Sequence, residues 1–312
     1  MERELPRPAL ARARQTYHVR ELQERGEIAA LLNGDRSYAA YALGQLEQAY
    51  FTQSRWWRAQ SGRGEGLVLH SRGGLGDAVF VEGDAPAIDV LLSLHPGPVR
   101  TYVTCRAEHL SILKKHFFVS NQQVMMRMAV DPASFQAAPA TFDIRRLRGP
   151  DVRDLNHLYG SEGATTFYNS WHIDDGVYFG VYEGRRLVAA AGTHVVAPAY
   201  GVAVVGNVFT HPGRRGRGFA KAASGAVTAE LLRSCRDVVL TVDPGNLSAV
   251  AAYHALGYRE QGRLIEAAAV RKDLLGLAAG VRRWLARRRG HADTSRGSAV
   301  EVVTRRDPAS GL

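Results

Sequence analysis

Apolar positions recur along the chain in two patterns that predict interleaved strands and helices. Short runs of β-branched and apolar residues predict strands, for example "QQVMMRMAV" (122–130) and "GVAVVGNVFT" (201–210). Longer segments with apolar residues on one side predict helices, for example "FAKAASGAVTAELLRSC" (219–235). Because the two kinds of element alternate throughout, the sequence predicts an α/β protein with a mixed sheet.

Turn-forming and charged stretches divide the chain into units. The stretch "DPASFQAAPA" is rich in Pro, Ala and Ser, which is typical of a linker between two folded units. The predicted units are 1–15, a flexible basic arm; 16–130, a first folded unit; 131–140, a linker; 141–273, a second folded unit; and 274–312, a basic helix followed by a disordered tail.

Charge and cysteine content narrow the class of protein. The net charge is +10, and residues 271–312 hold ten Lys/Arg against four acids, so the excess lies mainly in the tail. We expect this tail to be solvated; the alternative is that it contacts nucleic acid or an anionic surface. No apolar run is long enough to span a membrane and the N-terminus does not resemble a signal peptide, so we expect a cytoplasmic protein. Cys105 and Cys235 form no metal-binding pattern, so no metal is expected.

A glycine- and arginine-rich stretch, "VFTHPGRRGRGFAKAASG" (208–225), joins a predicted strand to a predicted helix. The first backbone N–H groups of a helix are unpaired, and glycines before it let an anion approach them. Gly216 and Gly218 suit that role, and Arg215 and Arg217 add positive charge. The stretch lacks the Gly-Lys-Ser/Thr of a Walker loop, and Lys221 stands where a Rossmann fingerprint needs its third glycine. It therefore predicts a phosphate or pyrophosphate site, with a solvated basic loop as the alternative.

The first unit contains a similar stretch, "SRGGLGDA" (71–78). It leads into "VFVEG", which predicts a strand and not a helix. Without a helix N-terminus there are no free N–H groups to bind an anion, so we interpret it as a hairpin turn.

A second motif, "DPGNLSAVAAYHALGY" (243–258), follows the predicted anion site. Asn246 is a suitable helix N-cap, and Gly257 is a suitable residue just beyond the helix end. Asn246, Ala249 and Tyr253 then share one helix face. Considered alone, Tyr253 could be an ordinary core aromatic.

Together the two motifs resemble the GNAT superfamily of acyl-CoA-dependent N-acetyltransferases. The first matches the family pattern as Arg215-x-x-Gly218-x-Ala220, and the second through the set Asn246, Ala249, Tyr253, Gly257 and Tyr258. The resemblance covers about 140–272. The first unit matches only in its order of elements and resembles a degenerate second GNAT-like domain, so a tandem GNAT fold is expected.

The resemblance implies where acetyl-CoA binds. Backbone N–H groups of the glycine loop would hold the pyrophosphate, and the end of the preceding strand would bind the pantetheine arm and polarise the thioester carbonyl. The coenzyme-binding residues that it implies are Val208, Phe209, Thr210, Arg215, Gly216, Arg217, Gly218, Phe219, Ala220, Lys221, Asn246 and Tyr253.

The resemblance further implies transfer of an acetyl group to an amine, carried by a small molecule or a peptide. Tyr253 would protonate the departing sulfur. Many relatives take the amine proton with a glutamate on the strand before the loop, but "VAVVGNVFT" contains no acid. We therefore choose His194 as the base, because its intrinsic pKa suits proton transfer near neutrality; the other candidates are Glu162, His172 and Glu266. The alternative function is a non-catalytic acyl-CoA-binding sensor or partner protein.

Overall fold

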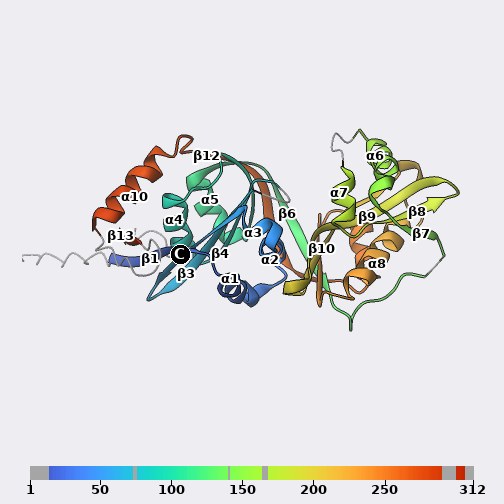
Figure 1. The fold of residues 1–312 in the computed structure, drawn as a ribbon, viewed down its shortest axis with the longest axis horizontal. Coiled ribbons are helices and arrows are strands. Elements are labelled where there is room, and N and C mark those ends of the chain that lie inside the picture. Colours follow the sequence, from blue (N-terminus) through green and yellow to red (C-terminus); the bar gives the residue numbers. More distant parts are fainter. Residues whose placement is uncertain (1–13, 73–75, 140, 164–167, 290–299, 306–312) are drawn as a thin grey trace, which may run out of the picture.

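The computed structural model describes residues 14–72, 76–139, 141–163, 168–289 and 300–305, and within them all strands join one mixed sheet (Figure 1). The strands are β1 Arg14–Leu22, β2 Ser54–Ser61, β3 Gly64–Ser71, β4 Ala78–Gly83, β5 Arg100–Cys105, β6 Phe117–Val130, β7 Asp143–Arg146, β8 Phe179–Glu183, β9 Arg186–Ala197, β10 Val202–Thr210, β11 Asp237–Val242, β12 Arg259–Arg271 and β13 Val300–Arg305. The α-helices are α1 Arg25–Leu32, α2 Ala40–Gly44, α3 Gln48–Phe51, α4 Ala85–Leu94, α5 Leu110–His116, α6 Val152–Gly160, α7 Ser170–Asp174, α8 Phe219–Leu231, α9 Leu247–His254 and α10 Leu277–Arg289.

The strand order shows two halves, each contributing a consecutive run of strands. The order is β13-β1-β2-β3-β4-β5-β12-β6-β11-β10-β9-β8-β7. We call β1 to β6 with their helices the N-terminal half, and β7 to β12 with their helices the C-terminal half. In both halves a helix links two parallel neighbours, α4 between β4 and β5 and α8 between β10 and β11. This repeated order agrees with the predicted tandem arrangement.

The halves are interlocked by an exchange of strands at the centre of the sheet. β6 of the N-terminal half pairs antiparallel with β11, and β12 of the C-terminal half pairs antiparallel with β5. The two exchanged strands also pair with each other along most of their length. Each half therefore has its sheet completed by a strand from the other.

The segment predicted as a linker packs against the C-terminal half. The Gln136 N–H donates to the Leu256 carbonyl at 3.0 Å, and Phe135 packs against the core cluster beneath α8. Gly257 has φ +91°, and a Cβ there would lie 2.0 Å from the Ser134 carbonyl oxygen. Gly257 thus ends α9, as its position predicted, and also admits the linker backbone.

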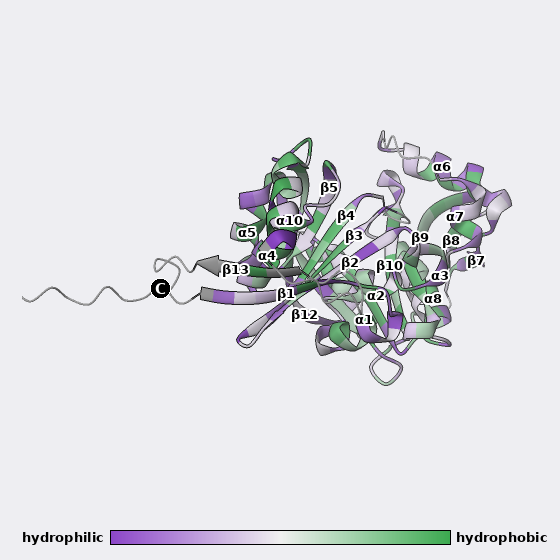
Figure 2. Ribbon diagram, turned by 60° about the vertical axis from the view of Figure 1, so that its left-hand side comes forward, coloured by the Kyte–Doolittle hydropathy of each residue, from purple (hydrophilic) through white to green (hydrophobic). Residues whose placement is uncertain are grey.

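Helices cover both faces of the sheet, and hydrophobic residues line the strands between them (Figure 2). On one face α8 packs over β8 to β10. On the other face α1 and α2 of the N-terminal half join a cluster in which Leu43 is buried with Val204 of β10 and Leu264 of β12. Gly44 makes this contact possible, because a Cβ there would lie 2.4 Å from Val195 Cγ1. Hydrophobic burial thus holds α2 directly above the C-terminal half.

Several predicted boundaries differ from the structure. Arg14 and Gln15, predicted in the arm, begin β1. Val300–Arg305, predicted as disordered tail, pair antiparallel with β1 as β13, because that edge strand has backbone groups available for pairing. The predicted basic helix is observed as α10. The rest of the predicted arm and tail lies outside the described residues.

The exchanged strands predict that neither half folds alone. We expect a fragment of residues 141–312 to be insoluble, because without β6 and β5 the edges of β11 and β12 are unpaired. Coexpression with residues 1–140 should restore a soluble heterodimer, measured by size-exclusion chromatography and circular dichroism. A monomeric 141–312 fragment that unfolds cooperatively would contradict this.

Candidate acyl-CoA and acceptor site

The neighbouring strands β10 and β11 separate where β10 approaches its end. Their parallel pairing covers only Val202–Val205. Beyond it, Gly206, Phe209 and Thr210 keep their partners on β9, but no pairing with β11 occurs in the described chain. One edge of the β10 backbone is therefore open. Such a gap at the end of parallel strands is a frequent ligand site in open sheets.

The glycine loop ends beside this gap and carries unpaired N–H groups. Gly216 and Gly218 have φ of 76° and 83°, which favours glycine, and Gly218 is the N-cap of α8. The first N–H of α8 to find a backbone acceptor is that of Ala222, which donates to the Gly218 carbonyl at 3.0 Å. Within the described residues, the N–H groups of 216–221 have no backbone partner. This is the anion-binding geometry that the sequence predicted.

The loop arginines are occupied by acidic partners. Arg215 pairs with Glu162 at 2.5 Å, while Glu183 pairs with both Arg214, at 2.6 Å, and Arg217, at 2.7 Å. These ion pairs partly neutralise the side chains to which the sequence assigned anion binding. The unpaired backbone N–H groups of this loop are therefore better suited than its arginine side chains to bind an anion.

Phe219 differs from its predicted role in one respect. Its ring is buried in the core beneath α8 and packs edge-on against Phe142, with 4.9 Å between the ring centroids. Only its backbone N–H can therefore contribute to an anion site.

The second motif, 243–258, packs on the α8 face of the sheet, in the same cluster as the residue that follows the glycine loop. Asn246 caps α9 by accepting the Ala249 N–H at 3.2 Å, as its position predicted. Tyr253 is buried in the cluster that contains Phe219, and Val208 packs against that cluster. Burial raises the pKa of Tyr253 to about 12, so its phenol is protonated at neutral pH. A protonated phenol therefore lies in the same cluster as the start of α8 and next to the end of β10.

Among its described residues, the N-terminal half has no helix start equivalent to that of α8. Its β4 and α4 are joined by Asp84 alone, whose carboxylate accepts the Glu65 N–H at 2.9 Å. This negative charge at the start of α4 opposes binding of a phosphate. The "SRGGLGDA" stretch lies in the antiparallel β3–β4 connection, as predicted, although 73–75 are outside the described residues.

On the opposite face of the sheet, two irregularities bring His194 and Asn207 together. Val195 pairs with Val204 and Thr193 with Val205, so His194 is an extra residue in β9. A second irregularity in β10 includes Asn207, whose φ is 52°. The His194 Nε2 lies 3.0 Å from the Asn207 Oδ1.

The orientation of Asn207 fixes the protonation of His194. The Asn207 Nδ2 donates to the Thr193 carbonyl at 3.4 Å and to the Tyr178 hydroxyl at 2.8 Å, so Oδ1 must face the imidazole. The Tyr168 hydroxyl also donates to Oδ1, at 2.7 Å. Because Oδ1 only accepts, His194 carries its proton on Nε2 and leaves Nδ1 as an acceptor.

The His194 Nδ1 is bound by a residue from the N-terminal half. The Tyr41 hydroxyl of α2 lies 2.7 Å away and donates to it. His194 is solvent-exposed as a residue, but protein surrounds much of its ring, since Gly206 lies directly beneath it. Burial lowers the pKa of His194, and nearby Arg127 lowers it further, whereas burial raises the pKa of Tyr41 to about 12. Both groups are therefore neutral at pH 7.

Arg127 of β6 lies beneath Tyr41. Its side chain is 2% exposed in the folded chain, and none of its guanidinium nitrogens has a hydrogen-bond partner among the described residues. The Arg127 Cζ lies 5.1 Å from the centre of the Tyr41 ring, so the ring face partly compensates the charge. Burial lowers the pKa of Arg127, although Tyr41 and Glu266 favour its charged form.

The other three base candidates have structural partners. Glu162 pairs with Arg215, and the His172 Nδ1 accepts the Asn169 N–H at 3.2 Å. Burial raises the pKa of Glu266, which accepts the Tyr102 hydroxyl at 3.3 Å. Sequence reasoning missed Tyr41, Arg127 and Asn207; the only visible signal was the single arginine within "VMMRMAV".

A helix start with unpaired N–H groups, an open strand edge and the Tyr41–His194 pair thus lie on one mixed sheet. Residues 143–258 match the model of the Acetyltransferase (GNAT) family. The chain therefore contains a GNAT acetyltransferase domain. Domains of this family are in general acyl-CoA-dependent N-acetyltransferases with acetyl-CoA as the donor.

Similar solved structures extend the likeness in fold beyond this domain. A GCN5-related N-acetyltransferase from Sphaerobacter thermophilus has 16% identity and a TM-score of 0.51, covering 82% of this chain and 95% of its own. A Drosophila protein has 13% identity and a TM-score of 0.59, covering 81% and 98%. A tandem GNAT protein from the clavulanic acid biosynthesis pathway has 13% identity and a TM-score of 0.47, covering 82% and 98%. No curated protein matches the chain.

No group of three or more His, Cys, Asp or Glu side chains among the described residues could hold a metal ion. No helix in that part of the chain is both long and apolar enough to cross a membrane.

The glycine loop predicts the effect of Gly218→Val. We expect acetyl-CoA affinity to fall at least tenfold, because a β-branched residue disfavours the φ of 83° and shields the loop N–H groups. Isothermal titration calorimetry should show one site per chain in the unaltered protein. The matched control is Gly76→Val, at φ +91° in the N-terminal turn, where a Cβ has no neighbour within 4 Å. Equal affinity in the two variants would show that the loop is wrongly assigned.

Proposed function

We propose that the chain transfers an acetyl group from acetyl-CoA to the amine of a small molecule or peptide, with the C-terminal half as the catalytic domain. The observation that carries this proposal is the gap between β10 and β11. Tyr253 lies on the α8 face of the sheet with the start of α8, and His194 lies on the α2 face with Tyr41. A donor held on the α8 face could then meet an acceptor on the α2 face.

On the donor side, the N–H groups of 216–221 would bind the coenzyme A pyrophosphate. Val208, Phe209 and Thr210 belong to the open edge of β10, where the pantetheine arm could add to the sheet by backbone hydrogen bonds. An N–H of this edge would stabilise the oxyanion that forms when the thioester carbonyl is attacked.

On the acceptor side, Tyr41 and His194 would act as a proton relay. The ammonium of the acceptor gives a proton to the Tyr41 oxygen while the Tyr41 hydroxyl proton passes to the His194 Nδ1. The free amine attacks the thioester carbon, and the attacking nitrogen, which is cationic after the attack, gives its surplus proton to solvent. The carbon–sulfur bond breaks, and Tyr253 gives its proton to the sulfur. The products are an N-acetyl amide and coenzyme A thiol, and solvent returns Tyr253 and His194 to their starting states.

Asn207 and Arg127 would position and tune this relay. Asn207 holds the His194 Nε2–H, which keeps Nδ1 facing Tyr41. The charge of Arg127 favours negative charge on the Tyr41 oxygen during transfer and opposes a long-lived imidazolium.

The second candidate is an acyl-CoA-binding protein without turnover, since β10 carries no glutamate to serve as base. A screen of amino acids, polyamines, aminoglycosides and peptides for acetyl-CoA-dependent thiol release separates the two. Release with any amine supports the enzyme. Calorimetric binding of acetyl-CoA without release over the whole screen supports the sensor.

Tyr253→Phe tests the proposed general acid. We expect kcat to fall by roughly 10–100-fold, with a much smaller change in the KM for acetyl-CoA, because proton donation to sulfur develops in the transition state. Steady-state kinetics with an acceptor from the screen measures both, with Tyr182→Phe on β8 as the control. An unchanged kcat, with chemistry shown to limit turnover, would make Tyr253 a structural aromatic.

The relay predicts a distinctive pH dependence. The ordinary pKa of a histidine is ~6.5, and that of His194 is lowered, so its imidazole stays neutral as the pH falls to that value. We therefore expect kcat/KM to decline only below this pH. Tyr41→Phe should lower kcat/KM by about 10–100-fold, and His194→Ala should add little to that loss. Tyr50→Phe in α3 is the control. Fully additive effects of the two substitutions would contradict a relay.

A further inference from the structure

Helix α10 presents its large apolar side chains to solvent and its small ones to the protein. Leu277, Val281 and Trp284 are 67%, 57% and 51% exposed. The buried positions of the helix are alanines, Ala279 at 1% and Ala286 at 9% exposure. A surface helix of a soluble protein ordinarily has the opposite arrangement.

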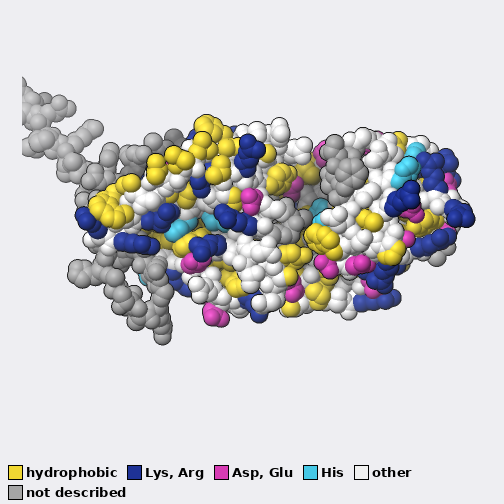
Figure 3. All heavy atoms as spheres, turned by 45° about the horizontal axis from the view of Figure 1, so that its top comes forward, with side chains coloured by type: hydrophobic (Ala, Val, Ile, Leu, Met, Phe, Trp, Pro, Cys, Tyr) yellow, Lys and Arg dark blue, Asp and Glu magenta, His cyan; other side chains and the backbone are white. Residues whose placement is uncertain are grey.

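The exposed residues form one continuous stripe. Leu277, Val281, Trp284 and Leu285 follow the i, i+4, i+7, i+8 spacing of a single helix face. Leu275, which is 81% exposed, extends the stripe beyond the helix start. Figure 3 shows hydrophobic side chains in a row at the α10 end of the molecule, with Lys and Arg beside them. An apolar surface of this kind indicates a binding partner.

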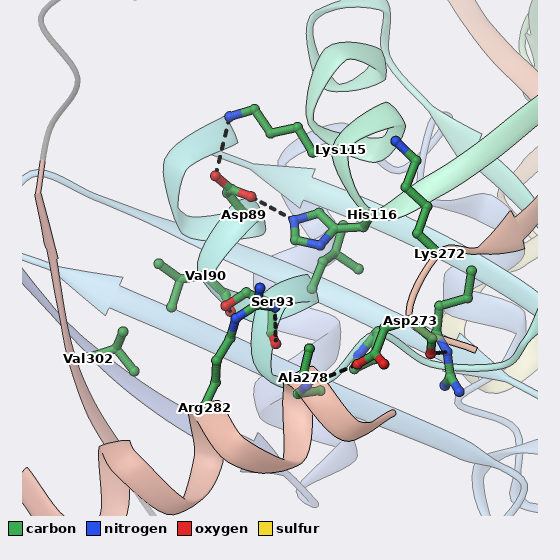
Figure 4. Close-up of a pocket in the computed structure, with 14 residues that line it drawn as sticks. Asp89, Val90, Ser93, Lys115, His116, Lys272, Asp273, Ala278, Arg282 and Val302 are labelled. Atoms are coloured by element: carbon green, nitrogen blue, oxygen red, sulfur yellow. Dashed lines mark hydrogen bonds and ion pairs between the residues drawn. The ribbon is translucent and has the colours of Figure 1, made fainter. Parts of the chain in front are cut away.

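Positive charge accompanies the stripe. Residues 274–289 contain five arginines and no acidic residue. Arg282 donates to the Ser93 carbonyl at 3.3 Å, and Arg283 donates to the Leu94 carbonyl. Figure 4 shows Arg282 and Ser93 on the inner side of α10. These bonds attach the helix to the C-terminus of α4, whose dipole favours cations.

The basic surface continues beside the helix. A pocket of about 860 Å³ lies between α10 and the start of β2, and its lining includes Arg55, Arg72 and Arg271 but no acidic residue. Leu275 belongs to both the pocket and the stripe. Within α10, the Arg288 Cζ lies 3.9 Å from the Trp284 ring centre, so an arginine directly borders the exposed aromatic.

We propose that α10 docks the protein onto an anionic lipid bilayer, with its apolar stripe at the acyl boundary and its arginines on the headgroup phosphates. Helices that lie in a membrane surface combine Leu and Trp on one face with Lys or Arg beside them. Nucleic acid would complement the arginines but would leave the leucine stripe in water. α10 lies at the opposite end of the molecule from α8, so a docked protein keeps its acyl-CoA site in solution (Figure 1).

Cosedimentation of the full chain with vesicles tests the docking. We expect binding to vesicles of phosphatidylcholine with phosphatidylglycerol and much weaker binding to phosphatidylcholine alone. Leu277→Glu with Val281→Glu should lower the partition coefficient at least about tenfold, because two apolar side chains no longer enter the lipid. The matched control is Phe118→Glu with Val124→Glu, two exposed apolar residues of β6. Circular dichroism confirms that both variants are folded.

A second arm tests the charge and the depth of the helix. Arg287→Gln with Arg288→Gln should weaken binding to the anionic vesicles and make that binding less dependent on salt. The control pair Arg233→Gln with Arg263→Gln, outside α10, should change neither. Lipids with brominated acyl chains should quench the tryptophan fluorescence of the bound protein. The quenched component should be missing from the Trp284→Phe variant. The proposal is overturned by absence of vesicle binding, by equal affinity for neutral vesicles, or by binding that is insensitive to the Leu277 and Val281 changes. Binding of DNA or an acidic protein in place of vesicles also overturns it.

Discussion

The structure depends on the exchange of β6 and β12 at the centre of the sheet. Each strand supplies the backbone hydrogen bonds that the other half lacks, and the two pair with each other. Unpaired backbone groups buried at those edges would be costly, so we expect the halves to be stable only together. The exchange also continues one sheet through both halves, which brings α1 and α2 over β9 to β11.

The interlocking explains why the N-terminal half matters although no anion site equivalent to that of α8 occurs among its described residues. Asp84 stands where an anion would have to bind, yet this half supplies Tyr41 and Arg127 to the neighbourhood of His194. A buried guanidinium without a hydrogen-bond partner is destabilising. Its place beneath Tyr41 is consistent with a role in tuning the proposed proton relay, and such strain against local rules commonly marks functional sites.

The two ends of the molecule are chemically different. At one end, Glu162 and Glu183 pair with the loop arginines, so that the unpaired backbone N–H groups are better placed than the arginines to bind the proposed anion. At the other end, the arginines of α10 border an exposed apolar stripe and lie beside a basic pocket without acidic lining. The positive net charge is thus concentrated where α10 would meet an anionic surface.

The sequence by itself determined the local features. Positive φ at Gly216 and Gly218, the Asn246 cap and the Gly257 helix end follow from short stretches of chain, because sterics and unpaired N–H groups act between neighbouring residues. These features identified the GNAT-like motifs and the coenzyme-binding hypothesis. The element order also gave the mixed sheet.

Only the tertiary structure decided which strands pair and which side chains meet across them. The exchange of β6 and β12, the addition of β13 to β1, and the extra residue at His194 arise from pairing between segments far apart in the sequence. Tyr41 meets His194 across 153 positions. Local propensity cannot specify such contacts, because they depend on burying surfaces from both halves at once.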